Sequence, residues 1–492
     1  MNGSIIRRII GYVLILEGGL MLLPCIVALV YGERQGFAYL ITAVGCLVLG
    51  YLLKFKKAKN TVFYLKEGCV ATALSWIVLS VFGSIPFMLT GEIPSPINAL
   101  FETVSGFTTT GASILTDVEA MSHCSLFWRS FTHWVGGMGV LVFLLAVVPL
   151  SGGSNINLMK AESPGPSVGK LVPKMRRTAR ILYVIYFAMT VVEIVMLLCG
   201  GMPLFDSLTL SFGSAGTGGF GIKNDSVASY SSYCQWVITV FMALFGINFN
   251  FYYFLLFRQF KKAFGMEEVR AYILIIIAAT GIIFANTIQI YNNFSEALCK
   301  AAFQVSSVIT TTGYSTADFN QWSDLSKSVL FLLMFIGACA GSTGGGLKVS
   351  RLLVGAKTVR KELGSYIHPK SVKKITLDGK PVEKEVIRAT NVYFITYALI
   401  FVGSWLIVSL EDHDIITNLT AVASAFNNIG PGLELVGPAE NFNFLSPITK
   451  SVLIFDMLAG RLELFPLLVL FNPRLWRERN TQIANRLRKK RG

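Results

Sequence analysis

Ten long apolar stretches constrain this chain more than any other feature. A bilayer core of about 30 Å needs about 20 apolar residues in a helix, because backbone polar groups cannot stay unpaired in lipid. Of the 492 residues, 53% are apolar and 14% charged, whereas a soluble domain carries about 25% charged residues. The pattern therefore predicts an all-α polytopic membrane protein of about ten spans. The stretches run approximately over 9–31, 36–53, 69–90, 131–150, 181–200, 236–257, 271–291, 328–355, 391–410 and 449–472.

Basic residues are unevenly distributed among the loops. If the N-terminus is cytoplasmic, the cytoplasmic loops and the two ends hold 36 of the 43 Lys and Arg residues. Because Lys and Arg concentrate on the cytoplasmic side, the count predicts a multi-pass protein with both termini cytoplasmic. The net charge of +15 would suggest nucleic acid in a soluble protein. In a chain that spans a lipid bilayer, this charge instead reflects the excess of basic residues on one side of the membrane. We therefore expect no nucleic-acid partner.

Four of the expected external loops contain a further apolar run of about a dozen residues. A helix of that length reaches only about 18 Å, so it cannot cross the membrane. The expected N-caps of the first, third and fourth runs are Ser95, Ser295 and Asp414. The second run offers Pro203 in its expected first turn. The sequence predicts half-helices that enter the membrane and turn back, which requires surrounding protein or water.

Each run ends in a short Gly-containing tract, and the four tracts align with one glycine in register. The unit of span, half-helix, tract and span therefore occurs four times. Four pseudo-symmetric helix, pore-loop and helix repeats around a central pore would bring the tracts together. The aligned triplets are Thr109, Thr110 and Gly111; Gly216, Thr217 and Gly218; Thr311, Thr312 and Gly313; and Asn428, Ile429 and Gly430.

A ring of backbone carbonyls from these tracts can replace the hydration shell of a monovalent cation. Glycine permits the backbone dihedrals that such a ring requires, and each half-helix would direct its partially negative C-terminal end toward the cavity. Acidic residues at the external mouth would raise the local cation concentration. Acidic residues expected at this mouth include Asp117, Glu119, Asp318, Asp324, Asp412 and Glu434.

The eighth span is interrupted by the sequence GSTGGG. Its apolar run from about Val329 to Ala340 covers only two thirds of the membrane core. Our hypothesis is a mobile loop over residues 339–346 that obstructs conduction until a cytosolic partner pulls on the basic segment 347–388. The alternative is a static kink, since Gly is frequent in membrane helices. The gate glycines are Gly341, Gly344, Gly345 and Gly346.

Arg461 lies within the last apolar stretch, halfway along the expected span. A lipid-facing charge at that depth costs several kcal/mol, so its side chain should point inward. We expect it below the tracts as an electrostatic barrier, with a tract or loop carbonyl as partner. An ion pair with Asp456 or Glu463 is the alternative, although neither residue lies on its helical face.

Several other patterns are weaker. Gly216, Gly218 and Gly221 spell GxGxxG without the strand and helix that a dinucleotide site needs. We therefore expect no nucleotide site on this chain. The sequence shows no cluster of nucleophilic, acidic, basic or metal-binding residues of the kind that an enzyme needs, so we do not predict an enzyme. The intramembrane Glu17 and Glu193 fit interhelical hydrogen bonds better than proton coupling.

Cys124 and Cys234 are both expected on the external side. They could pair as a disulfide or remain two free thiols.

The tracts, with GSTGGGLKVSR at 341–351, NNIGPG at 427–432 and MLAGRLELFPLLVLF at 457–471, resemble the Trk/Ktr/HKT superfamily of potassium transporters. The resemblance covers essentially the whole chain. It is strongest to the bacterial TrkH/TrkG branch, because two additional spans precede the first repeat. In plant relatives a Ser at the first glycine position accompanies sodium transport, so Gly111 favours potassium.

The resemblance implies a potassium-translocating subunit of a bacterial inner (cytoplasmic) membrane, with potassium as the substrate. It further implies a homodimer and gating by a cytosolic, nucleotide-binding regulatory subunit of the TrkA type. A potassium symporter coupled to protons or sodium, and a sodium-permeable relative, are alternatives. An alternating-access carrier would instead have inverted repeats and ionisable side chains at the midplane.

The expected organisation has five parts. A two-helix N-terminal element, 1–60, precedes the repeats. Pore repeats one and two occupy 61–160 and 161–262. Pore repeat three, with a broken second helix, occupies 263–365, and 366–492 holds pore repeat four with a basic cytosolic tail.

Overall fold

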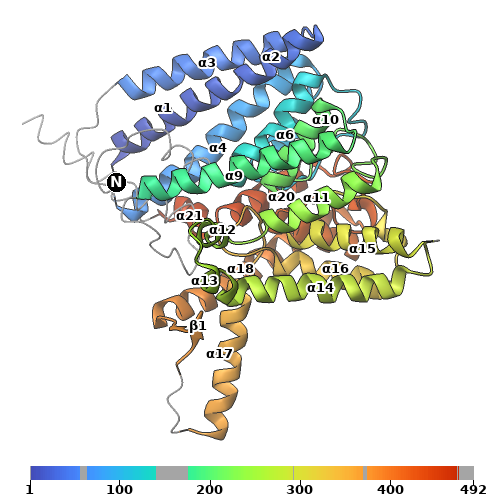
Figure 1. Cartoon of the computed structure of the whole chain (residues 1–492). Helices are drawn as coiled ribbons and strands as arrows, with labels where there is room; N and C mark the ends of the chain where they lie inside the picture. The colour runs from blue at the N-terminus through green and yellow to red at the C-terminus, as the bar shows by residue number, and fades with distance from the viewer. Residues whose placement is uncertain are drawn as a thin grey trace, which may run out of the picture.

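The structure is a computed structural model that describes residues 2–55, 64–139, 175–291, 293–369, 374–473 and 475. Its regular structure is almost entirely helical, with one short antiparallel hairpin. The all-α fold expected from the sequence is confirmed, and the helices pack as a body from which one long helix projects (Figure 1).

The N-terminal element consists of α1 (Gly3–Leu20), α2 (Leu22–Tyr31) and α3 (Gly36–Phe55). Helices α1 and α3 lie side by side along one edge of the body (Figure 1). Their backbones approach closely at Gly11 and Gly50, where an added Cβ would lie 2.8 Å and 2.7 Å from the carbonyl oxygen of the opposite glycine. Small residues at such contacts allow close helix packing in membranes.

Four sets of helices follow, each with a half-helix between longer elements. The first is α4 (Leu65–Thr90), α5 (Pro96–Phe107) and α6 (His123–Gly137). The second is α9 (Met175–Cys199), α10 (Leu204–Gly216), α11 (Ser232–Phe245), α12 (Phe249–Leu256) and the short α13 (Phe260–Gly265). The third is α14 (Glu267–Thr287), α15 (Phe294–Ile309), η1 (Phe319–Gln321), α16 (Asp324–Ile336) and α17 (Val349–Ile367). The fourth is α18 (Lys384–Val408), η2 (Ser409–Glu411), α19 (Ile415–Asn427), η3 (Glu434–Val436), α20 (Pro447–Arg461), α21 (Phe465–Leu468) and η4 (Val469–Phe471).

Six helices of the described part are long and apolar enough to span a membrane, or seven if the bent pair α11 and α12 counts as one span. That pair bends by 91°, whereas the sequence predicted a continuous sixth span. The Gly246–Asn248 break separates its two halves, and the Asn248 side chain caps α12 by accepting from Asn250 N. The expected fourth span begins earlier, at His123, and its second half lies outside the described residues.

The half-helices α5, α10, α15 and α19 occur where the sequence predicted them, with small differences at their starts. Ser95 and Asp414 are the N-cap residues of α5 and α19, and Asp414 accepts from the backbone N–H groups of Ile416 and Thr417. Helix α15 instead starts at Phe294 with Asn293 as its N-cap, so the expectation for Ser295 was wrong by two residues.

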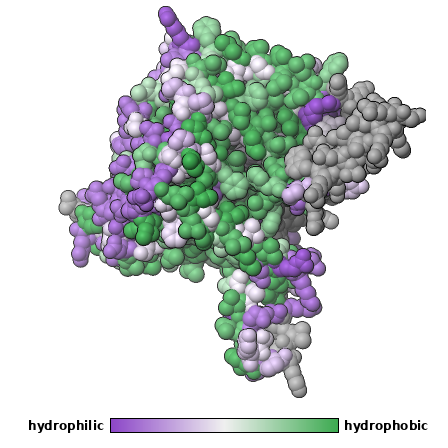
Figure 2. Space-filling model, turned by 180° about the vertical axis from the view of Figure 1, so that it is seen from behind, coloured by the Kyte–Doolittle hydropathy of each residue, from purple (hydrophilic) through white to green (hydrophobic). Residues whose placement is uncertain are grey.

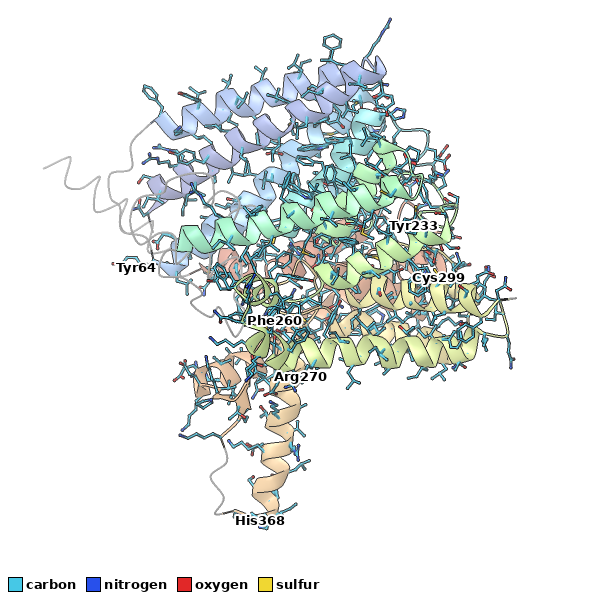
Figure 3. All side chains as sticks on the ribbon, in the orientation of Figure 1. Tyr64, Tyr233, Phe260, Arg270, Cys299 and His368 are labelled. Carbon is cyan, nitrogen blue, oxygen red and sulfur yellow. The ribbon has the colours of Figure 1, made fainter. Side chains whose placement is uncertain are left out.

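An arm extends from the body below α14. It comprises α17 and the hairpin of β1 (Thr376–Leu377) and β2 (Lys380–Pro381), in which Thr376 pairs with Pro381 (Figure 1). His368 marks its far end, and Arg270 lies at the root of the arm (Figure 3). Hydrophobic residues cover much of the body, while hydrophilic residues gather along one edge and on the arm (Figure 2).

Candidate ion pathway

The four tracts after the half-helices share one backbone conformation. Each contains a non-glycine residue with positive φ, followed two positions later by a glycine with positive φ. An L-residue tolerates this region poorly, whereas glycine adopts it freely. The pairs are Thr109 (56°) and Gly111 (79°), Thr217 (55°) and Gly219 (78°), Thr311 (59°) and Gly313 (84°), and Asn428 (57°) and Gly430 (100°).

The second tract therefore corrects the predicted alignment by one residue. Gly219, not Gly218, is equivalent to the other three glycines. The shift arises because α10 continues as helix to Gly216 before Thr217 turns left-handed. Gly216 is thus the last helical residue, packed so closely on α6 that an added Cβ would overlap the carbonyl of His133.

The four glycines meet in a closed backbone ring. A Cβ added to Gly111 would lie 1.9 Å from the carbonyl oxygen of Gly218, in the second tract. The same geometry relates each glycine to the next tract around the ring, so any side chain would collide with neighbouring backbone. The other three pairs are Gly219 with Thr312 at 1.9 Å, Gly313 with Ile429 at 2.0 Å and Gly430 with Thr110 at 2.8 Å.

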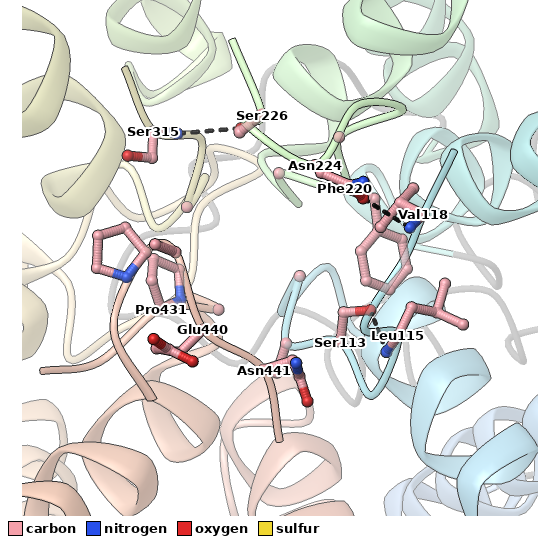
Figure 4. Close-up of a pocket in the computed structure, with 18 of the residues that line it drawn as sticks. Ser113, Leu115, Val118, Phe220, Asn224, Ser226, Ser315, Pro431, Glu440 and Asn441 are labelled. Carbon is pink, nitrogen blue, oxygen red and sulfur yellow. Dashed lines mark hydrogen bonds between the residues drawn. The ribbon is translucent and has the colours of Figure 1, made fainter. Parts of the chain in front are cut away.

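One side of the ring opens into a cavity of about 180 Å³, which we call the vestibule (Figure 4). The four ring glycines line its floor, and the segments that follow each tract form its walls. Glu440 and Asn441 also line it, and neither was predicted from the sequence. Their position shortly after the NNIGPG tract is the sequence feature that could have indicated them. The carboxylates of Asp117 and Glu119 instead accept from Asn224, through Nδ2 at 2.9 Å and the backbone N–H at 3.1 Å.

The glycine-rich segment between α16 and α17 interrupts the helix, as predicted. We call residues 337–348 the glycine loop; its Gly337, Gly341 and Gly346 have positive φ. Gly345 donates its backbone N–H to Thr311 Oγ1 at 2.6 Å. Added Cβ atoms on Gly344 and Gly345 would lie 2.9 Å and 2.5 Å from the carbonyl oxygens of Thr310 and Asn427. The loop therefore packs directly against the third and fourth tracts.

Arg461 contacts backbone carbonyls of two different units. It donates to the carbonyl oxygens of Thr343 at 2.7 Å, in the glycine loop, and of Gly136 and Gly137 at 2.5 Å and 2.6 Å, at the end of α6. The expected contact with a loop carbonyl is therefore present. The expected position halfway along a continuous span was wrong, because α20 ends at Arg461 itself.

The two carboxylates considered as alternative partners of Arg461 contact other side chains. Glu463 forms an ion pair with Arg351 of α17. Asp456 accepts a hydrogen bond from Ser404 at 2.7 Å. Glu463 and Leu464 have positive φ, so the chain turns sharply directly after Arg461. This turn divides the stretch 449–472, which the sequence predicted to be one span.

Glu268, at the start of α14, holds the glycine loop at Ala340 and the first turn of α17 at Ser350. It is 4% exposed, and its Oε1 accepts from the backbone N–H groups of Ala340 at 2.6 Å and Ser350 at 3.1 Å. Asn248 donates to Oε2 at 3.4 Å. Sequence reasoning missed Glu268, because a carboxylate at a helix start is an ordinary surface pattern.

Its neighbour Glu267 pairs outside the body. The Glu267 carboxylate binds Lys357 of α17 and accepts from the backbone N–H of Asp378 at 3.1 Å. Asp378 Oδ1 in turn accepts from the backbone N–H of Glu267 at 2.7 Å. Two consecutive carboxylates thus hold the hairpin of the arm and the glycine loop to the same turn of α14.

The remaining candidates from the sequence are two intramembrane glutamates and two cysteines. Glu17 and Glu193 are fully buried. The expectation that they form interhelical hydrogen bonds was wrong for the described residues, because none of their four carboxylate oxygens has a hydrogen-bond partner there. Cys124 and Cys234 are both free thiols rather than a disulfide. Among the described residues, no group of three His, Cys, Asp or Glu side chains could hold a metal ion.

The geometry defines a class of protein: a polytopic membrane protein in which four re-entrant half-helices end at a central backbone ring. Comparison with known proteins then identifies the family. The model of the TrkH family, described as cation transport proteins, matches residues 35–482. The chain therefore belongs to the TrkH family, and it is a multi-pass membrane transport protein rather than an enzyme.

Individual relatives agree over nearly the full length. The Trk system potassium uptake protein TrkH of Salmonella typhimurium is 36% identical over 488 residues, 97% of this chain and 100% of that protein. The Trk system potassium uptake protein TrkG of Escherichia coli is 32% identical with the same coverage. The crystal structure of the potassium transporter TrkH from Vibrio parahaemolyticus matches with a TM-score of 0.87 at 32% identity, covering 97% of this chain and 100% of that chain.

Proposed function

We propose that this chain is the potassium-translocating membrane subunit of a Trk-type uptake system and moves potassium inward. The observation that carries the proposal is the closed ring of four glycine tracts. Backbone oxygens arranged around an axis can replace the hydration shell of potassium. The names of the full-length relatives, which are potassium uptake proteins, support potassium as the substrate.

The proposed selectivity filter consists of three residues from each tract. We shift the second triplet by one residue from the sequence-based alignment, and the positive φ angles of Thr217 and Gly219 support this shift. The filter residues are Thr109, Thr110 and Gly111; Thr217, Gly218 and Gly219; Thr311, Thr312 and Gly313; and Asn428, Ile429 and Gly430.

The proposed gate is the glycine loop with Arg461. The packing of Gly344 and Gly345 against the tracts supports an obstruction directly below the filter. The hydrogen bond from Arg461 to Thr343 ties the loop to α20 and places a positive charge beside the cation pathway. The expected gate glycines are Gly341, Gly344, Gly345 and Gly346.

Control of the gate is assigned to a cytosolic, nucleotide-binding regulatory subunit of the TrkA type. The arm formed by α17 and its hairpin, which is bound to α14 through Glu267, is a suitable handle for such a partner. We further propose a homodimer in the bacterial inner membrane, with both termini cytoplasmic and the five-part organisation given above.

A filter experiment tests the function. Replacing Gly111 or Gly313 by Ser places a side chain against a neighbouring carbonyl, so each variant should lower the ratio of potassium to sodium flux in liposomes. Retained selectivity in both folded variants would contradict the filter.

Parallel flux assays with imposed sodium or proton gradients separate uniport from the coupled alternatives. Potassium uptake that follows the potassium gradient alone, with sodium excluded, supports uniport. Uptake driven by either imposed gradient would establish a symporter.

A further inference from the structure

A buried charge pair lies between the first and second tracts. Arg129 of α6 is 3% exposed and Glu102 of α5 is fully buried, with Nε donating to Oε1 at 2.5 Å. A buried charge without its partner is strongly destabilising. A rearrangement that separated Arg129 from Glu102 would leave both charges in this state and is therefore disfavoured. The pair therefore fixes the relative position of the two helices that carry it.

Glu102 also holds the outer end of the first tract. Its Oε1 accepts from Ser113 Oγ at 2.9 Å, and its Oε2 accepts from the backbone N–H of Ile114 at 3.0 Å. Ser113 and Ile114 follow Gly111 by two and three residues. Both oxygens of the carboxylate thus restrain the chain where it leaves the ring.

Arg129 extends this restraint to the second tract. Its Nη1 donates to the carbonyl oxygen of Gly221 at 2.8 Å, and its Nη2 donates to Ser113 Oγ at 3.1 Å. Its Cζ lies 3.8 Å from the ring centre of Phe220. Because Phe220 and Gly221 directly follow Gly219, one planar guanidinium contacts both tracts beside the ring.

The other units lack this charge at the equivalent position. Counted nine residues before each ring glycine, Glu102 corresponds to Leu210, Gln304 and Ala421. Gln304 donates to Ser315 Oγ at 3.1 Å, which reproduces the restraint of Glu102 on Ser113 without a charge. We call the ion pair of Glu102 and Arg129, with its contacts to the first and second tracts, the clamp. Among the four units, a carboxylate at this position occurs only in the first.

We propose that Glu102 and Arg129 are positioning residues that set the spacing of the first and second tracts, and so determine discrimination between potassium and sodium. The proposal rests on the proposed function of the ring as a filter. A ring held at fixed spacing cannot contract around the smaller sodium ion. Loss of the clamp should therefore admit sodium rather than abolish cation passage.

Two substitutions separate geometry from charge. Arg129→Lys retains the positive charge but loses the planar fork that contacts Gly221 and Ser113 together. Glu102→Gln removes the negative charge but keeps a side chain that the third unit already accommodates as Gln304. Glu33→Gln is the matched control, because Glu33 accepts from the backbone N–H of His123 at the start of the same helix, outside the ring.

The experiment measures radioactive rubidium and sodium uptake by the full-length chain in liposomes. Arg129→Lys and Glu102→Gln should each lower the rubidium to sodium ratio about tenfold, equivalent to about 1.4 kcal/mol. Glu33→Gln should leave the ratio unchanged. An unchanged ratio in both folded clamp variants overturns the proposal, as does an equal loss in the control.

Three further variants make every result decisive. If the clamp variants do not fold, Ser113→Ala removes only the hydroxyl shared by Glu102 and Arg129. A lowered ratio then supports the clamp, and an unchanged ratio overturns it. Gly111→Ser and Gly313→Ser distinguish the clamp from the filter. If only these two variants lower the ratio, the clamp fails while the filter stands, whereas an unchanged ratio in both refutes the filter itself.

Discussion

Replacing Glu268 by Ala should release the glycine loop and raise cation flux in the absence of any cytosolic partner. The carboxylate accepts from Ala340 N at 2.6 Å, within the loop, and from Ser350 N at 3.1 Å, directly after the loop. Hydrogen bonds to a charged group contribute about 1.5–3 kcal/mol each, so losing both removes about 3–6 kcal/mol. Each 1.4 kcal/mol is about tenfold in an equilibrium constant.

Other contacts keep the shift toward the low end of this range. The loop remains held by Gly345 N on Thr311 Oγ1 at 2.6 Å and by Arg461 on Thr343 O at 2.7 Å. We therefore expect a shift of about a hundredfold in the equilibrium between obstructed and open loop. Glu268→Gln keeps a neutral acceptor and should produce about a tenfold shift, because neutral hydrogen bonds contribute about 1 kcal/mol.

The assay is rubidium flux into liposomes that contain the chain without a cytosolic partner. Flux should rise in the order wild type, Glu268→Gln, Glu268→Ala. Glu267→Gln is the matched control, since this neighbouring carboxylate binds Lys357 and the hairpin rather than the loop. The reasoning is refuted if Glu268→Ala is folded and conducts no more than wild type, while deletion of the glycine loop raises flux.

Two further predictions concern other contacts. Arg461→Ala removes three charge-assisted hydrogen bonds to backbone carbonyls and the charge beside the pathway, so rubidium flux should rise at least about tenfold; unchanged flux would exclude a barrier role. Partial burial raises the pKa of Glu33, but hydrogen bonds from the backbone N–H groups of Cys124 and His123 outweigh it and hold the pKa below 4.5. The ionised carboxylate therefore stabilises the fold above the unfolded-state pKa, and this stabilisation is lost as pH falls through the lowered folded-state pKa. Glu33→Gln should lower Tm at pH 7, with the difference from wild type shrinking toward pH 3; a difference independent of pH would contradict this.

The sequence predicted the elements that depend on local composition. Apolar length predicted a helical chain that crosses a membrane, and cap chemistry at Ser95 and Asp414 located two half-helices. The triple glycine predicted the interruption after α16, because glycine disfavours helix wherever it stands. These features follow from short-range preferences and from the thickness of the bilayer.

The sequence alone was less reliable for register and for helix breaks inside apolar segments. Three closely spaced glycines allowed the second tract to be aligned on Gly218, and only the left-handed turn at Thr217 identified Gly219. The bend after Phe245 and the turn after Arg461 occur inside stretches whose mean hydropathy predicted continuous spans, and hydropathy carries no information about backbone direction.

By itself the sequence determined that this chain crosses a membrane, that four units repeat and that a glycine-containing tract follows each half-helix. Only the tertiary structure decided which atoms meet: the clamp of Glu102 and Arg129 joins α5 to α6, and Glu268 reaches a loop 72 residues away at Ala340. Periodicity and composition report how each segment partitions between water and lipid. Pairings between distant segments depend on how the helices pack, so buried charges acquire their partners only in the folded protein.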